Sequence, residues 1–282
     1  MYYSTIHTHT TYCDGKNTAE EMILAAINCN MKSIGISSHA PLPVKSIFGI
    51  DSDKTEKYID EVNQLKNKYE DKIDVLLGME IDYFINSKFN HVPKELVEKL
   101  DYFIGSIHFL GKNENNGKLP WTVDASYEEF KQGINSDFEG SNQKAISSYY
   151  YYLGEMVKEY KPTVLGHMDL VKKLNKNNIL FDENDQWYKK AVKDCLDEVA
   201  KTNTVVEINT GAIAKGYASV QYPSDWILDE IKDRNISITI NSDAHYKEHV
   251  NYAFHDMYRL VKEKNMPSIV YLTKDGWKNM NI

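Results

Sequence analysis

Residues 3–39 read YSTIHTHTTYCDGKNTAEEMILAAINCNMKSIGISSH, and this stretch predicts the repeating unit of the fold. It begins with a β-rich run at 3–9 and ends with another at 33–39. Between them, residues 18–30 carry apolar side chains at three- and four-residue steps, the period of a helix. Thr18 with Glu21 three residues later is the capping-box pattern of a helix start. A strand, a helix and a second strand in this order indicate a βαβ unit with parallel strands.

The same alternation continues along the chain. Further β-rich runs lie at 73–81, 102–108, 163–167, 204–209, 236–241 and, late in the chain, 268–273, and further helical periods at 54–69, 93–99, 147–160, 185–201 and 224–234. With seven or eight such units, a closed or nearly closed α/β barrel is the economical arrangement. We expect one domain over residues 1–282, because the sequence contains no internal repeat, low-complexity tract or linker.

Residues 111–144 break this rhythm. They are polar and rich in Asn, Gly, Lys and Glu, with Pro120, Trp121 and one short helical pattern at 127–132. A connection of this length in a compact domain is usually a functional loop or a mobile segment. Two interpretations stay open, a lid over the functional site and a surface insertion without function.

Composition excludes several classes of protein. The 282 residues include 33 Lys and Arg against 41 Asp and Glu, a net charge of −8, which disfavours binding to a nucleic-acid backbone. The apolar runs are too short to span a membrane, and the first residues lack the features of a secretory signal. Cys13, Cys29 and Cys195 are an odd set without paired spacing, so we expect neither disulfides nor a zinc ribbon. We expect a cytoplasmic protein, and the oligomeric state stays open.

Six of the nine histidines lie at the ends of predicted strands, together with Glu80 and Asp243. Asp14 follows the first strand in a loop and could reach back over the barrel mouth. The carboxyl ends of all strands open on one face of a parallel barrel, so these side chains should converge there. Residues at i and i+2 of a strand point to the same side, which applies to the His7–His9 and Asp243–His245 pairs. The candidate ligands are His7, His9, Asp14, His39, Glu80, His108, His167, Asp243 and His245.

Metal binding is the chemistry that this set favours. A lone strand histidine is more often a core residue than a ligand, and Glu80 alone could be half of a buried salt bridge. Nine ionisable groups gathered at strand ends are costly to bury unless a metal compensates them. They exceed the needs of one four-coordinate ion and suit a cluster of two or three ions. Imidazole and carboxylate without thiolate favour zinc, manganese or iron over calcium or magnesium.

Six motifs follow one another along the chain: HTHTTYCDG at 7–15, ISSHAP at 36–41, GMEID at 78–82, GSIHF at 105–109, GHMD at 166–169 and NSDAH at 241–245. In this order they resemble the motifs of the PHP phosphoesterases, the family named for polymerase and histidinol phosphatase. The resemblance covers about the whole chain.

The resemblance implies a distorted (β/α)7 barrel of the PHP type that holds three divalent ions at the carboxyl ends of its strands. Some family members have histidine where this chain has Asp14, an exchange that could alter which metal fills the third site. Carried over residue by residue, the resemblance implies one ion on His7, His9, Glu80 and Asp243, a second on Glu80, His108 and His167, and a third on Asp14, His39 and His245.

The resemblance also implies a reaction. The length, the single domain and VEINTGAIAKG at 206–216 are similar to the monofunctional histidinol-phosphatase subfamily, whose substrate is L-histidinol phosphate. We expect in-line attack on phosphorus by a metal-bridging hydroxide, without a phosphoenzyme. Asp243 is the candidate to orient the nucleophile or accept its proton, and a metal-bound water near His245 could protonate the leaving alkoxide.

Substrate contacts are predicted from fewer signals. Lys215 matches a basic position of the family and could pair with phosphate, as could Lys172 or Lys173, although ordinary solvated lysine is the alternative for each. Glu207 or Asn209 could receive the amino or imidazole group, and Asn209 equally fits a turn. Two other functions stay open: hydrolysis of another small phosphate ester or a nucleotide, and a non-catalytic metal-binding barrel.

Overall fold

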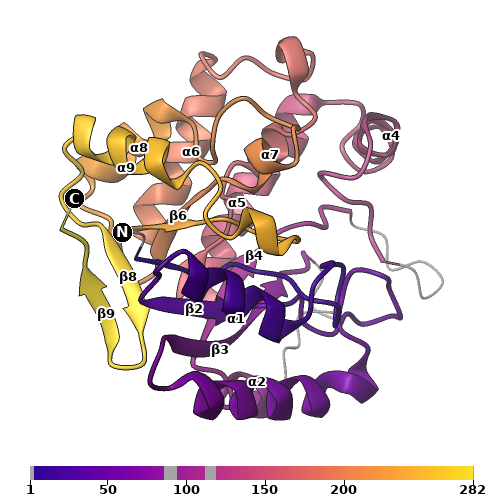
Figure 1. Cartoon of the computed structure of the whole chain (residues 1–282). Helices are drawn as coiled ribbons and strands as arrows, with labels where there is room; N and C mark the ends of the chain where they lie inside the picture. Colours follow the sequence, from indigo (N-terminus) through magenta and orange to yellow (C-terminus); the bar gives the residue numbers. More distant parts are fainter. Residues whose placement is uncertain (1–2, 86–93, 112–118, 282) are drawn as a thin grey trace.

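Seven parallel strands follow one another around a barrel in chain order in the computed structural model, which describes residues 3–85, 94–111 and 119–281 (Figure 1). They are β1 (Ser4–Thr5), β2 (Ser33–Ile36), β3 (Asp74–Asp82), β4 (Tyr102–Ser106), β5 (Val164–Leu165), β6 (Val205–Asn209) and β7 (Ile238–Asn241). The circle closes beyond β1 and β7, where the His9 amide donates to the Ala244 carbonyl at 2.9 Å and Thr8 bridges Ala244 in parallel. This arrangement confirms the predicted barrel.

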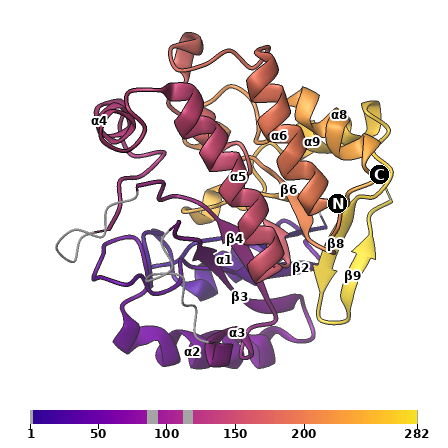
Figure 2. The ribbon, with the colours of Figure 1, turned by 180° about the vertical axis from the view of Figure 1, so that it is seen from behind.

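Helices cover the outside of the barrel, and α5 and α6 pack side by side (Figures 1 and 2). The capping box predicted for the first helix is present, with the Thr18 hydroxyl accepting from the Glu21 amide. Short 3₁₀ turns lie at Ser52–Lys54, Leu170–Lys172, Lys176–Asn178 and Lys247–His249. The helices are α1 (Ala19–Asn28), α2 (Thr55–Tyr69), α3 (Lys94–Val97), α4 (Tyr127–Asp137), α5 (Asn142–Tyr160), α6 (Gln186–Val199), α7 (Gly211–Ala214), α8 (Asp225–Asp233) and α9 (Phe254–Glu263).

The late β-rich run is not an eighth barrel strand. It forms β8 (Val270–Thr273), which pairs antiparallel with β9 (Gly276–Asn279) in a separate hairpin. Only Lys274 and Asp275 separate the two strands, and a connection of two residues can join antiparallel strands but not parallel ones. The sequence patterns missed β9, α7 and α9.

Apolar side chains fill the inside of the barrel below its carboxyl end, and we call this cluster the barrel floor. Tyr102 lies at its centre and donates from its hydroxyl to the Ile6 carbonyl at 2.6 Å. Gly35 and Gly78 make room for its ring, since a Cβ at these positions would come within 2.0 and 2.3 Å of Tyr102 atoms. The floor consists of Ile6, Leu76, Tyr102, Ile104, Val164 and, from the hairpin, Leu272.

Part of the polar segment at 111–144 is folded onto the barrel. Two backbone hydrogen bonds, Leu110 amide to Trp121 carbonyl and Val123 amide to His108 carbonyl, join it to the end of β4 at 3.1 and 2.8 Å. Helix α4 is longer than the pattern at 127–132 predicted and buries Phe130. The lid prediction falls partly on residues 112–118, which lie outside the described residues. None of the helices in the described ranges is long and apolar enough to cross a membrane.

Candidate metal centre

Glu80, near the end of β3, lies at the centre of the predicted ligand set. Its side chain is 1% exposed, and the Ser106 hydroxyl donates to Oε1 at 2.7 Å. Its position is fixed by the backbone, because Glu80 forms a parallel bridge with His39 beyond β2. Its carboxylate oxygens face the ring nitrogens of His167 at 3.0 Å, His7 at 3.1 Å, His39 at 3.2 Å, His9 at 3.4 Å and His108 at 3.7 Å.

Asp243, just beyond β7, approaches two of these histidines and also His245. Its Oδ1 lies 3.2 Å from His9 Nε2, 3.9 Å from His7 Nε2 and 3.4 Å from His245 Nδ1. Its backbone φ of 47° is in the left-handed region, which Asp tolerates better than most residues. Gly211 allows this close approach, since a Cβ there would come within 2.8 Å of the Asp243 Cβ.

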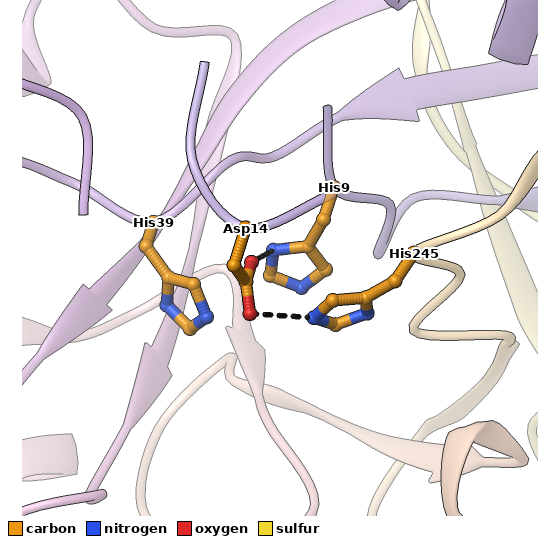
Figure 3. Close-up of side chains that lie close together, drawn as sticks. All are labelled: His9, Asp14, His39 and His245. Atoms are coloured by element: carbon orange, nitrogen blue, oxygen red, sulfur yellow. Dashed lines mark hydrogen bonds and ion pairs between the residues drawn. The ribbon is translucent and has the colours of Figure 1, made fainter. Parts of the chain in front are cut away.

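Asp14, from the loop after β1, completes a third group with His9, His39 and His245 (Figure 3). His245 Nε2 lies 3.1 Å from Asp14 Oδ2, and His9 Nδ1 lies 3.7 Å from Asp14 Oδ1. The His9 and His245 rings stack with centroids 4.1 Å apart. The loop therefore returns over the barrel mouth as its position in the sequence predicted.

All nine predicted residues thus meet in one place, which we call the barrel mouth. The groups overlap more than the three-site division predicted, because His9 belongs to two of them and His108 groups with His39 and Glu80 rather than with His167. The groups whose ligand atoms lie within 4.8 Å of one another are His9, Asp14, His39 and His245; His7, His9 and Asp243; His7, Glu80 and His167; and His39, Glu80 and His108.

The mouth fits divalent metal in two respects. Its donors are imidazole and carboxylate, the set that suits zinc, manganese or iron. Among the described residues, His9 Nε2, Asp14 Oδ1 and His167 Nδ1 are buried atoms that have no partner with hydrogen-bond geometry, although polar atoms lie close to the first two. Such atoms are rare in folded proteins and call for a partner. A bound cation would supply it for the atoms that face the mouth.

The pKa shifts in the mouth differ in direction, so that some of its groups are charged near neutral pH and others are neutral. Burial alone would raise the pKa of Glu80, but His39 and His7 hold it well below its usual value. Burial, with His245 and His39 nearby, lowers the pKa of His9 to about 3, so this ring is neutral and able to bind metal. Burial also opposes a charge on His108, yet Asp82 and Glu80 raise its pKa to about 10. Metal binding at His108 must therefore release a proton.

Two carboxylates behind the mouth orient its histidines, and only one was singled out from the sequence. Glu207 is 0% exposed and accepts from His7 Nδ1 at 3.0 Å and from the His167 amide at 2.8 Å. Asp82, which was missed, lies 2.8 Å from His108 Nδ1. Its signal was the spacing in GMEID, because residues 80 and 82 of one strand point to the same side. A carboxylate on the outer nitrogen fixes the tautomer of a metal-binding histidine.

The mouth opens into a pocket of about 500 Å³. Lys215 lines it, with Nζ 3.8 Å from Asp243 Oδ1, and Lys173 lines it as well. Three predicted substrate contacts have protein partners instead and are not part of the pocket wall. Lys172 pairs with Asp169 at 2.8 Å. Glu207 holds His7, and Asn209 Oδ1 accepts from the Gly211 amide in a turn at 2.8 Å.

A model of the PHP domain family matches residues 5–211, well over half of the chain. The chain belongs to the PHP domain family. A histidinol-phosphatase of Bacillus subtilis is 28% identical to this PHP chain over 264 residues, covering 88% of it and 95% of the relative.

Solved structures share the fold of this PHP chain. A Lactococcus lactis histidinol phosphate phosphatase, solved with zinc, L-histidinol and phosphate, is 18% identical with a TM-score of 0.73, covering 98% of this chain and 99% of its own. A Listeria monocytogenes protein described as a candidate histidinol phosphatase is 22% identical with a TM-score of 0.76, covering 90% and 99%. These likenesses show the PHP barrel.

Proposed function

We propose that this PHP protein is a metal-dependent phosphomonoesterase that hydrolyses L-histidinol phosphate to L-histidinol and phosphate in histidine biosynthesis. The observation that carries the proposal is the convergence of nine candidate metal-ligating side chains, seven of which line one pocket. A relative named histidinol-phosphatase, matched over 95% of its length, supports the choice of substrate. So does the L. lactis structure with L-histidinol and phosphate.

We infer three divalent ions in the mouth, with zinc, manganese and iron as the candidates. His7, His9, Glu80 and Asp243 would hold one, Glu80, His108 and His167 another, and Asp14, His39 and His245 the third, with His9 and His39 near enough to be shared. Divalent ions supply Lewis acidity and make water a better nucleophile near neutral pH. The L. lactis structure contains zinc, which supports the class of metal.

In this proposal, residues around the mouth bind the phosphate, orient the attacking water and lie near the leaving group. Lys215, 26% exposed and directed toward Asp243, is placed to pair with a phosphate oxygen as a point charge. Asp243 stays ionised because Lys215 and His7 outweigh burial and lower its pKa, so it can accept a hydrogen bond or a proton from attacking water. His245 Nδ1 faces the Asp243 carbonyl at 3.0 Å, a contact that holds the ring in place. In this proposal the leaving alkoxide lies on the same side of the mouth as His245.

Steady-state kinetics with L-histidinol phosphate and p-nitrophenyl phosphate test the substrate. We expect kcat/KM to favour L-histidinol phosphate by at least about 100-fold, because specific contacts to the alcohol should add to the binding of phosphate. Equal values for the two esters would contradict the proposal. A panel of nucleotides and other small phosphate esters covers the alternative substrates. Absence of turnover in the whole panel with metal bound would instead indicate a non-catalytic barrel.

A further inference from the structure

One pocket carboxylate, Asp124, belongs to neither the nine candidate ligands nor the residues that orient them. It follows Val123, whose amide donates to the His108 carbonyl at 2.8 Å, and so stands beside the mouth on a segment tied to the end of β4. Its side chain is 25% exposed and lines the pocket. Burial alone would raise its pKa, but His108 and Lys173 hold the pKa below its usual value, so the group is charged at neutral pH.

Lys173 is the only group among the described residues that reaches the Asp124 carboxylate within hydrogen-bonding distance, at 2.8 Å from Oδ2. The other additional carboxylate of the pocket, Asp82, is committed to His108. Lys173 is 20% exposed, and its ammonium lies 4.8 Å from the centroid of Tyr217, a ring that is 60% exposed on the same pocket wall. Asp124 therefore has one cationic partner, itself partly exposed, and a side open to the pocket.

The neighbouring pair shows what a purely structural lysine does in this fold. Lys172 is 9% exposed and its ammonium contacts Asp169 at 2.8 Å and Ser224 Oγ at 2.7 Å, behind the pocket wall. Protein groups satisfy both members of the Lys172–Asp169 pair, since the Ser224 amide also donates to Asp169. The Asp124–Lys173 pair has no such enclosure and faces the space that a substrate would occupy.

We propose that Asp124 binds the ammonium group of the substrate while the phosphate lies toward Lys215 and the metal ligands. The inference rests on the proposed function, in which the substrate is a phosphate ester that carries a primary amine. In the free enzyme Lys173 neutralises Asp124, and in the complex the substrate ammonium joins or replaces it on the carboxylate. A charge-assisted hydrogen bond to a partly buried carboxylate is strong enough to select amine-bearing esters. The exposed Tyr217 ring on the same pocket wall suits a cation as well.

Two esters of equal length isolate this contact. O-Phosphoethanolamine ends in an ammonium group, and n-propyl phosphate ends in a methyl group at the same place. The metal-loaded wild type should prefer the amine by at least about tenfold in kcat/KM, the size expected for a polar group that its site is built to bind. A preference below about threefold, including failure to turn over either ester, overturns the inference.

Variants at the pair then assign the contact. Asp124→Asn should lower kcat/KM about 10- to 100-fold for L-histidinol phosphate and O-phosphoethanolamine, and change n-propyl phosphate less than about threefold. Asp124→Glu should restore part of the preference, and Lys173→Met should retain it. Equal loss on both esters in Asp124→Asn would mean that Asp124 only supports the pocket. Loss on both in Lys173→Met, with Asp124→Asn unchanged, would assign Lys173 to phosphate and overturn the inference.

The outcomes separate this inference from the proposed function. If the wild type turns over L-histidinol phosphate no better than p-nitrophenyl phosphate, the proposed function fails. If the wild type is selective for L-histidinol phosphate but Asp124→Asn leaves that selectivity intact, the function stands and the assignment of Asp124 is wrong.

Discussion

The two ends of the barrel interior are built from the same strands and have opposite chemistry. Toward the carboxyl ends lies the mouth, where Glu80 is 1% exposed among five histidines. Below it lies the floor, where Leu76 of the same strand and Ile104 of β4 are 2% and 0% exposed among apolar neighbours. A shift of four residues along β3 thus separates a charged cluster from a hydrophobic core.

This contrast shows how the fold divides stability from function. Burying the floor removes apolar surface from water and stabilises the barrel without further partners. Burying the charged groups of the mouth costs free energy, and its imidazole and carboxylate donors suit divalent metal ions as the partners that offset this cost. Substitutions in the floor should therefore act on the free energy of unfolding, and substitutions in the mouth on metal binding and catalysis.

The largest expected effect is at the centre of the mouth. Glu80→Gln keeps the size of the side chain but removes the carboxylate that faces five histidines. We expect kcat/KM to fall by more than about 100-fold, because ligand loss should exceed the effect of losing an orienting partner. Glu70→Gln, at an exposed position after α2, is the control and should match wild type. Similar losses in the two variants would mean that the mouth is not the site.

The next effect is at the floor. Leu272→Ala removes a side chain that is 7% exposed, and we expect the free energy of unfolding to fall by about 2–3 kcal/mol through lost burial and a cavity. Activity of the folded protein, measured as kcat/KM, should change less than about threefold. Lys278→Ala, exposed in the same hairpin, should leave stability within about 0.5 kcal/mol. Loss of activity without loss of stability in Leu272→Ala would break the division between the two ends.

Substitution of Glu207 tests whether a carboxylate behind the mouth contributes to metal binding. In Glu207→Gln an amide nitrogen would face donors, because His7, the His167 amide and Asn241 all direct hydrogen atoms at this carboxylate. Zinc affinity, measured by competition with a chelator, should fall by about 10- to 100-fold. Asp169→Asn is the matched control, a carboxylate of 0% exposure that pairs with Lys172 instead. It should weaken folding and leave zinc affinity unchanged, and equal effects on zinc in both variants would contradict an orienting role for Glu207.

The smallest effect is a pH dependence that only the mouth should show. The pKa of His108 is about 10 in the metal-free protein, so its ring is protonated between pH 6 and 8 and must lose that proton to bind metal. Zinc affinity should therefore fall as pH falls, by about tenfold per pH unit for each proton released. Calorimetry in buffers of different ionisation enthalpy counts these protons. Tyr102 of the floor, whose burial raises its pKa, contributes none. Zinc binding without proton release would contradict the charge assignment at His108.

The sequence predicted the order and direction of the barrel strands because each one is marked by a local apolar run followed by a helical period. The sequence patterns overestimated the lengths of β1 and β5. Residues such as His7 and His167 lie beyond the paired strands and turn their side chains into the mouth. The sequence left open whether residues 268–273 form an eighth barrel strand, and the two-residue turn after β8 determines an antiparallel hairpin.

The convergence of the nine candidate ligands could be predicted because eight of them lie at or just beyond the ends of strands, which a parallel barrel places on one face, and Asp14 lies in the loop after β1. The roles of Glu207, Asn209 and Lys172 could not be predicted from the sequence. Glu207 lies 200 residues from His7 along the chain, and only the closed barrel brings the two within 3.0 Å. Lys172 and Lys173 are adjacent in sequence, yet one is enclosed with Asp169 and the other faces the pocket.

The metal content of the purified protein tests the central claim most directly. Elemental analysis of wild type, gently purified and expressed with zinc, manganese and iron available, should give about three divalent ions per chain, which would use all nine ligands of the mouth. Glu80→Gln should hold fewer, and Leu272→Ala should hold as many as wild type. Zero or one ion per wild-type chain would contradict the account.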